Sequence, residues 1–301
     1  MANIINGKEQ AKYIIEKIKS HTEKYLENNK NAPNLSVILV GDNKASQTYV
    51  KSKMVKAKEC GFEITLHKYE DTISESELLA LIHKLNEDDA VNGILVQLPL
   101  PGHINSNYIC QSVSPSKDVD GFTQKNIGAL WSNYNSNYTS SNYLFPCTPL
   151  GIINLIEKVH GTSLSYLGAV VIGRSNIVGK PIASMLLQHD ATVTIVHSHT
   201  RDLHEVTKSA DILVSAVGSA KMIKKNFIKP GATVIDVGIN YYTNDDNKKC
   251  ICGDVDFEDC KEIAGHITPV PGGVGPMTIA MLMYNVLKSA CIKDNFEILQ
   301  L

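Results

Sequence analysis

A tyrosine and a lysine four residues apart could support catalysis. They are Tyr49 and Lys53, in the stretch TYVKSKMVKAKECG at 48–61. On a helix the two side chains lie on one face, beside an apolar stripe that includes Val50 and Ala57. Burial and neighbouring lysines push a lysine toward its neutral form, and a neutral amine can act as a general acid or base. Taken alone, the helix is better explained by a lysine that buries only its aliphatic stem.

A second candidate site is a glycine turn between a predicted strand and a predicted helix, in VVIGRSNIVGKPIASMLL at 170–187. Gly173 ends the strand, Ser175 stands two residues on, and Gly179 lies where the helix begins. The spacing departs from the G-x-G-x-x-G of dinucleotide-binding loops. Its physical elements are nevertheless present: a tight turn, a hydroxyl for phosphate, and helix N–H groups that attract an anion. The pattern favours dinucleotide binding over a turn whose glycines serve packing only.

The residues after the next strand indicate which dinucleotide binds. NAD-binding folds usually carry Asp or Glu there, to hold the ribose 2′-hydroxyl. This sequence has His197, Ser198, His199 and Thr200 at that point, and Arg174 in the first turn. A guanidinium with hydroxyls, in place of a carboxylate, favours a 2′-phosphate and therefore NADP. The two histidines alternate at strand spacing, so a solvated strand end also explains them.

Three further stretches carry groups suited to a ligand site. Gln97 in VQLPLP stands at the end of a predicted strand, where the ligand sites of α/β proteins gather. Asp118 and Asp120 in KDVDGF lie in a loop. ITPVPGGVGPMT at 267–278 is too rich in proline and glycine for regular structure, which lets a ligand approach the backbone closely. Each stretch alone is equally explained as a strand end, a turn or a linker.

The apolar patterning predicts an α/β protein of two lobes with mostly parallel sheets. In the first lobe a helical segment runs through residue 60 and a second helix covers 74–88, between strands predicted at 35–41, 63–69 and 92–101. A second βα series follows, with strands predicted at 168–173, 191–196, 210–218 and 231–239.

The order of the elements also predicts domain boundaries. We expect a catalytic domain over 1–148, completed by a C-terminal helix at 276–301, and a Rossmann-like nucleotide-binding domain over 149–275, with a cleft between them. A helix is predicted to begin near Pro149. The segment 131–143 is rich in Asn, Ser and Tyr without periodicity, which predicts an exposed loop.

Composition narrows the class of protein. The net charge of −2 gives no reason to expect nucleic-acid binding, and no apolar run approaches the roughly 20 residues of a membrane span. The first residues lack a signal-peptide or transit-peptide pattern, so we expect a cytoplasmic protein. The seven cysteines are odd in number and scattered, which suits reduced thiols. No C-x-x-C pair or histidine set completes a zinc site, so no metal is expected.

Together these stretches resemble one family. TYVKSKMVKAKECGF, GILVQLPLP, KDVDGF, PCTPLGI, GRSNIVGKP, ADILVSAVG and PVPGGVGPMT occur in the order found in the bifunctional methylenetetrahydrofolate dehydrogenase/methenyltetrahydrofolate cyclohydrolase family. The resemblance covers nearly the whole chain and is far more specific than a single glycine loop. One departure is visible, because the segment after Trp131 is longer and more polar than the usual connection.

The resemblance implies two reactions of one-carbon folate metabolism. In the first, 5,10-methylenetetrahydrofolate gives a hydride to NADP⁺ and becomes the 5,10-methenyl cation. In the second, water attacks that cation and yields 10-formyltetrahydrofolate. The implied cofactor is NADP, the implied substrates are tetrahydrofolate derivatives, and the implied assembly is a homodimer. The chain lacks the length of an attached formate–tetrahydrofolate ligase, so we expect a stand-alone enzyme with two activities.

The resemblance also implies roles for individual residues. Lys53 is the catalytic lysine, Tyr49 stacks on the folate rings, Gln97 positions the lysine, and Asp120 anchors the pterin. A partly neutral amine beside a cation can activate water, and a carboxylate presents two acceptors to the pterin N–H groups. Further substrate contacts are implied at Val50, Lys51, Ser52, Val96, Leu98, Pro271, Gly272, Gly273, Val274 and Gly275. Cofactor contacts are implied at Gly173, Arg174, Ser175, Ser198 and Ile239.

Three alternatives compete with this interpretation. A monofunctional dehydrogenase needs no water-activating lysine, so Lys53 and Gln97 argue against it. A non-catalytic NADP- or folate-binding protein does not need the full set of polar residues. An amino-acid-type dehydrogenase needs an arginine for its substrate carboxylate, and the only arginines, Arg174 and Arg201, are both assigned near the nucleotide.

Overall fold

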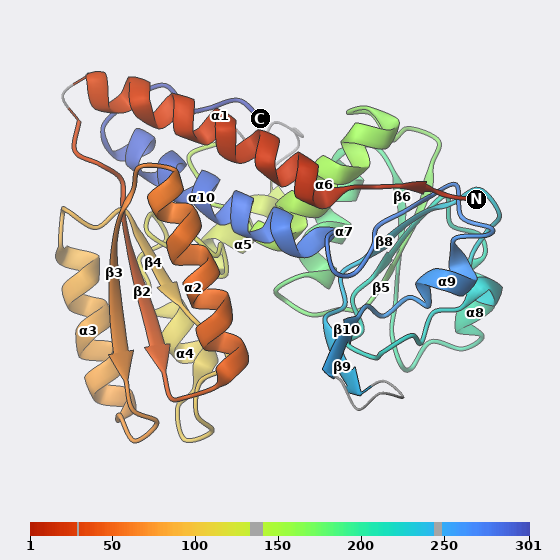
Figure 1. Ribbon diagram of the computed structural model, residues 1–301, viewed down its shortest axis with the longest axis horizontal. Helices are drawn as coiled ribbons and strands as arrows, with labels where there is room; N and C mark the ends of the chain where they lie inside the picture. The colour runs from red at the N-terminus through yellow and green to blue at the C-terminus, as the bar shows by residue number, and fades with distance from the viewer. Residues whose placement is uncertain (29, 133–140, 244–248) are drawn as a thin grey trace. The chain divides into compact units, whose positions relative to one another are not determined.

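The computed structural model describes residues 1–28, 30–132, 141–243 and 249–301 and divides into two compact units (Figure 1). The three-stranded unit comprises the described residues of 12–129, 141–147 and 279–301. The six-stranded unit comprises the described residues of 1–11, 130–132 and 148–278. The division falls within the first and last long helices, α1 (Gly7–Glu27) and α10 (Val274–Lys293).

The three-stranded unit is built on a parallel sheet with strand order β3-β2-β4. The central strand β2 (Asn34–Val40) pairs with β3 (Glu63–Tyr69) over its whole length and with β4 (Gly93–Val96). β2 and β4 are buried almost throughout, which explains their continuous apolar sequences, whereas the edge strand β3 is largely exposed. The connecting helices α2 (Lys44–Glu59) and α3 (Glu75–Glu87) lie on opposite sides of this sheet (Figure 1).

Local sequence signals set the ends of these two helices. The Asn43 side chain accepts the N–H groups of Ala45 and Ser46, both at 3.0 Å, and so caps the start of α2. α2 ends before Gly61, whose φ of +80° suits glycine. α3 begins with a capping box between Ser74 and Glu77. Its apolar face and α4 (Ser106–Gln111) pack in one hydrophobic cluster with side chains of β2 and β4.

The chain returns to this sheet after α4. The Ile94 N–H of β4 donates to the Lys117 carbonyl at 2.8 Å, and Asp118 forms a parallel bridge with Ile94. The segment at 117–119 therefore runs beside β4 and continues toward the end of the strand at Val96. α5 (Gln124–Ser132) follows it.

The six-stranded unit is a parallel sheet with strand order β1-β11-β8-β7-β5-β6. Its strands are β1 (Asn3–Ile4), β5 (Gly168–Ile172), β6 (Thr192–Val196), β7 (Ile212–Ser215), β8 (Thr233–Asp236) and β11 (His266–Ile267). Its helices include α6 (Cys147–His160), α7 (Gly179–Gln188), α8 (Leu203–Thr207), the 3-10 helix η1 (Lys225–Phe227) and α9 (Phe257–Cys260). A separate antiparallel pair consists of β9 (Asn240–Thr243) and β10 (Lys249–Cys252).

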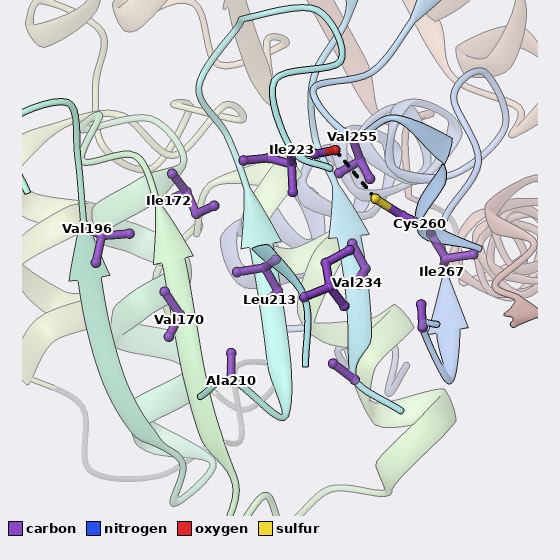
Figure 2. Close-up of a cluster of buried hydrophobic side chains, with 13 residues drawn as sticks. Val170, Ile172, Val196, Ala210, Leu213, Ile223, Val234, Val255, Cys260 and Ile267 are labelled. Carbon is purple, nitrogen blue, oxygen red and sulfur yellow. Dashed lines mark hydrogen bonds between the residues drawn. The ribbon is translucent and has the colours of Figure 1, made fainter. Parts of the chain in front are cut away.

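A hydrophobic cluster covers one side of the six-stranded sheet (Figure 2). Val170, Leu213 and Val234 come from three adjacent strands, and Val255 and Cys260 pack over them. The Cys260 thiol donates to the Ile223 carbonyl at 3.4 Å, so this cysteine behaves as a small core side chain with one weak hydrogen bond.

The predicted fold class is confirmed. Every strand predicted from an apolar run is present, and α6 begins two residues before Pro149. The predicted closing helix is present as α10, but it ends at Lys293 and does not extend to residue 301. One boundary differs from the prediction, because β1 pairs with β11 and residues 1–11 therefore belong to the six-stranded unit. A two-residue strand has no periodicity to detect, and its partner lies more than 260 residues away.

The predicted loop at 131–143 was wrong at its start, because Trp131 and Ser132 belong to α5. Residues 133–140 lie outside the described residues, whereas Ser141–Tyr143 form no helix or strand. Neither the long helix α1 nor the β9–β10 pair was predicted from the apolar pattern.

The sequence also made predictions about membrane spans, cysteines and metal sites. Among the described residues, no helix has the length and apolarity needed to cross a membrane. All seven cysteines are free, and five of them are buried. In the same described part of the chain, no cluster of three or more His, Cys, Asp and Glu side chains is arranged to hold a metal ion.

Candidate active site

Lys53 is buried in the middle of α2. Its side chain is only 6% exposed and shares the buried face of the helix with Ser46, Val50 and Ala57. The Lys53 amino nitrogen lies 5.1 Å from the centroid of the Tyr49 ring. Lys51, two residues earlier, is exposed, as expected for the opposite side of the helix. The lysine that the sequence singled out is therefore almost entirely buried, and its amino group lies beside the Tyr49 ring.

Gln97 is the hydrogen-bond partner of Lys53. The Lys53 Nζ donates to Gln97 Oε1 at 3.0 Å, and Gln97 Nε2 donates to the Leu98 carbonyl at 2.7 Å. Gln97 directly follows β4, and its own N–H donates to the Ile38 carbonyl of β2 at 2.9 Å. The sheet thus fixes the backbone, and the bond to Leu98 fixes the amide so that its oxygen faces the lysine.

A tight turn presents Asp120 beside the end of β4. The Asp118 carboxylate accepts the N–H groups of Gly121 at 3.0 Å and Thr123 at 2.7 Å, and the Asn126 side-chain amide at 3.0 Å. Gly121 has a φ of +73°, and a Cβ there would overlap the backbone at Phe145. Of the two loop aspartates, Asp118 therefore stabilises the turn through its hydrogen bonds, whereas Asp120 interacts with Lys53.

The charge of Asp120 is coupled to that of Lys53. Burial raises the pKa of Asp120 to about 6, the Lys53 ammonium opposes this rise, and Asp118 adds to it. A cavity of about 10 Å³ lies beside the carboxylate, lined by residues that include Val96, Asp118 and Phe122. Asp120 is therefore a partly desolvated carboxylate that is still mostly ionised at pH 7.

The glycine turn of the six-stranded unit has the compact backbone expected of a nucleotide loop. Gly173 has a φ of +121°, and a Cβ at Gly173 or Gly179 would overlap neighbouring backbone. The Ser175 hydroxyl oxygen accepts the N–H groups of Val178 and Gly179, both at 3.2 Å. Ser175 therefore stabilises the turn that leads into α7, and its hydroxyl hydrogen stays available to donate to a phosphate.

Arg174 and Ser198 follow adjacent parallel strands and leave the same edge of the sheet. Ile172 of β5 pairs with Val196 of β6, and Gly173 N–H donates to the Val196 carbonyl at 2.8 Å. Both side chains are exposed. The pKa of His197 is lowered by desolvation and by the positive charges of Arg174 and His199, so these groups lie close together. The edge combines a guanidinium and a hydroxyl, which suits a phosphate.

Two buried carboxylates that the sequence analysis missed shape the neighbouring loops. Asp254 accepts the N–H groups of Val217, Gly218 and Ser219 after β7, and the Asn240 amide at 2.9 Å. Asp236 accepts the N–H groups of Gly238, Asp254 and Val255. Burial raises the pKa of Asp236 to about 7, and Asp254 adds to the rise. The only sequence signal was their position in the glycine-containing runs DVGIN and CGDVD.

The other residues predicted to contact substrate or cofactor differ in how exposed they are. Val50 and Val96 are buried, Leu98 is partly buried and Ser52 is exposed. In the six-stranded unit Ile239 is 50% exposed, immediately before the anchored Asn240. Gly272, Gly273 and Val274 are buried where α10 begins, Gly275 is partly buried and Pro271 is exposed. The structure thus brings Tyr49, Lys53, Gln97 and Asp120 together in one unit, and Gly173, Arg174, Ser175 and Ser198 together in the other.

Two family models match most of the chain. The tetrahydrofolate dehydrogenase/cyclohydrolase catalytic domain matches residues 5–120, and the NAD(P)-binding domain of the same family matches residues 146–294. The chain belongs to this family.

Relatives of this family member are similar over their whole length. The chain is 52% identical over 294 residues to the bifunctional protein FolD of Brucella ovis, covering 97% of both chains. A crystal structure of FolD from Campylobacter jejuni has 44% identity and a TM-score of 0.89, covering 98% of this chain and 100% of that one. The Trypanosoma brucei dehydrogenase-cyclohydrolase, complexed with NADP cofactor and inhibitor, has 35% identity, a TM-score of 0.88 and 98% coverage of both chains.

The raised pKa of Asp120 predicts that its charge destabilises the folded protein. In the unfolded chain this carboxyl returns to the ordinary aspartate pKa of 3.8, so folding favours the protonated form. The contribution of the protonated Asp120 carboxyl to the free energy of unfolding is complete below pH values of about 4. It is lost as the pH rises through about 6. Asp120→Asn should therefore increase the free energy of unfolding by about 2–3 kcal/mol at pH 8, and by less at pH 5. Urea unfolding at the two pH values measures this.

Asp118→Asn is the matched control for that prediction. Its amide would place N–H groups against the donors of Gly121, Thr123 or Asn126, so this variant should be less stable than the wild type at both pH values. A loss of stability in Asp120→Asn at pH 8 would contradict the electrostatic assignment.

Proposed function

We propose that this protein oxidises 5,10-methylenetetrahydrofolate with NADP⁺ and hydrolyses the 5,10-methenyl product to 10-formyltetrahydrofolate. The observation that carries the proposal is the buried Lys53 amine, hydrogen-bonded to Gln97 beside Tyr49, in a member of the tetrahydrofolate dehydrogenase/cyclohydrolase family. Asp120 interacts electrostatically with the same amine. An acid–base group, an aromatic face and an anionic anchor are thus grouped within one unit.

Lys53 is the proposed acid–base group of the cyclohydrolase reaction. The Lys53 amine donates an N–H to Gln97 Oε1, and once it has given up a proton its lone pair can take a proton from water. The water oxygen then bonds to the electrophilic methenyl carbon, and the ammonium can return the proton when the ring C–N bond breaks. Gln97 cannot turn its amide without losing the bond to Leu98, so it holds the amine in one orientation. This division of roles accounts for both residues, whereas a monofunctional dehydrogenase leaves them unexplained.

Asp120 and Tyr49 are the proposed folate-binding side chains of this unit. An ionised Asp120 offers two oxygen acceptors to the pterin ring N–H and 2-amino groups, a bidentate arrangement. The Tyr49 ring is partly exposed, so one face can stack on the folate rings. The Lys53 ammonium lowers the pKa of Asp120, so the same pair of charges helps keep the anchor ionised.

The six-stranded unit is the proposed NADP-binding domain. The Gly173–Gly179 turn and the start of α7 suit a pyrophosphate, and Arg174 with Ser198 suits a 2′-phosphate. When bound, NADP⁺ supplies the hydride acceptor of the first reaction. The chain's own contribution is to bind and orient it, with the loops near Ile239 fixed by Asp236 and Asp254.

Domain roles, assembly and location complete the proposal. We assign folate chemistry to the three-stranded unit, and the substrate contacts implied at 271–275 stay a prediction of the family resemblance. A homodimer in the cytoplasm is proposed on the family resemblance. The exposed edge strand β6 is one surface on which a second copy could pair.

Lys53→Met should abolish the cyclohydrolase activity and leave the fold intact. Loss of a general acid–base group typically costs about 100-fold or more, whereas hydride transfer needs no water-activating amine. Hydrolysis of the methenyl substrate and formation of reduced cofactor are followed separately. Lys58→Met, which removes an exposed charge from the same helix, is the control and should retain both activities. Unchanged methenyl hydrolysis in Lys53→Met would remove Lys53 from the mechanism.

Arg174→Ala should weaken NADP binding much more than NAD binding. A charge-assisted hydrogen bond to a phosphate contributes about 1.5–3 kcal/mol, so we expect the KM for NADP⁺ to rise roughly 10-fold to 100-fold. The KM for NAD⁺ should change little, because NAD lacks the 2′-phosphate. Lys224→Ala, another exposed cation of the same unit, serves as the control. Equal losses for both cofactors would mean that Arg174 is no 2′-phosphate clamp.

A further inference from the structure

The buried face of α10 carries three polar side chains that hold main-chain carbonyl groups. Asn285, Lys288 and Ser289 are 1%, 2% and 6% exposed, and their spacing places them on one side of the helix. Lys288 donates to the Tyr143 carbonyl at 2.8 Å, and Ser289 bonds to the carbonyls of Asn92 and Ser116. Polar groups buried at such positions are costly unless they are hydrogen-bonded, so their partners indicate what they stabilise.

Asn285 joins the two segments that enclose Asp120. Its side-chain amide donates to the Val119 carbonyl at 2.8 Å and to the Phe145 carbonyl at 2.9 Å. Val119 directly precedes Asp120. Gly121 directly follows Asp120 and packs so closely on the backbone at Phe145 that no Cβ would fit. The Asn285 amide therefore fixes the backbone at Val119, directly before Asp120. It also fixes the backbone at Phe145, on which Gly121 packs directly after Asp120.

Ser289 also attaches this segment to α10, but at the Ser116 carbonyl, four residues before Asp120. The Asp118 carboxylate orders the turn internally but does not attach it to α10. The Cys147 thiol donates to the same Val119 carbonyl at 3.1 Å, a weak hydrogen bond. Asn285 Oδ1 is buried without a hydrogen-bond partner among the described residues, so the side chain acts here as a donor only.

We infer that Asn285 is a positioning residue for Asp120 and thereby sets the affinity of the enzyme for its folate substrate. The inference rests on the proposed role of Asp120 as the pterin anchor. A bidentate contact depends on the placement of both carboxylate oxygens, so a small shift of the Val119–Gly121 backbone weakens binding without affecting the amine of Lys53.

The first test is a split between binding and turnover. Asn285→Ser has a shorter side chain with a single donor, which cannot bond both the Val119 and Phe145 carbonyls, and it should preserve the fold. It should raise the KM for 5,10-methylenetetrahydrofolate at least fivefold, with kcat and the KM for NADP⁺ within twofold of the wild type. Ser289→Ala is the matched control, because it loses buried hydrogen bonds to carbonyls one turn further along α10. It should lower the urea midpoint comparably and leave the folate KM within twofold.

The second test asks whether Asn285 acts through Asp120. In an Asp120→Asn background, Asn285→Ser should change the folate KM less than twofold, because the anchor it positions is already lost. Two results would overturn the inference. One is a fivefold rise in the folate KM when Asn285→Ser is added to Asp120→Asn, and the other is an equal rise in the folate KM in Ser289→Ala. If Asn285→Ser cannot be isolated folded, Asn285→Gln, which keeps both donors on a longer side chain, is judged by the same criteria.

The two proposals fail in distinguishable ways. If Asp120→Asn leaves the folate KM unchanged, the pterin-anchor role fails, and the inference about Asn285 fails with it. If Asp120→Asn raises the folate KM and Asn285→Ser does not, only the positioning role of Asn285 is wrong.

Discussion

The hydrogen bond between the Lys53 amine and the Gln97 amide is the constraint on which the site depends. A buried amine needs a polar partner, and Gln97 supplies one from the end of β4. Because the Gln97 amide is held by Leu98, only its oxygen faces the lysine. The parallel pairing of β2 with β4 and the packing of α2 on this sheet therefore also bring the proposed acid–base group, Lys53, to its partner Gln97.

Asp120, the proposed pterin anchor, carries a cost in stability. Its neighbour Asp118 has three hydrogen-bond donors and serves the turn, whereas the environment of Asp120 is set by burial, a nearby cation and a nearby carboxylate. Burial raises the pKa of Asp120 to about 6, because the favourable interaction with Lys53 does not fully offset the loss of hydration. Asn285, at the other side of the turn, helps to hold the backbone of the turn.

Buried aspartates that accept backbone N–H groups recur in both units. Asp118 organises the turn of Asp120, and Asp254 organises the loop after β7 while holding Asn240. Each replaces the regular hydrogen bonds that an irregular loop cannot make with itself. Loops at the carboxyl ends of parallel strands can thereby be rigid without being helix or strand, which suits ligand binding.

The sequence by itself determined the two α/β series and the family, and it supplied the candidate site residues, because apolar runs, helix caps and short motifs are local signals. Tyr49 and Lys53 share a helix face by their spacing alone. Tertiary structure alone decided that Lys53 is buried, that Gln97 turns its oxygen toward the amine, and that Asp118 and Asp120 have different surroundings. It also decided the pairing of β1 with β11 and the contacts of Asn285, which join residues between 140 and more than 260 positions apart. Contacts over such separations depend on how the whole chain packs, and no local pattern of residues encodes them.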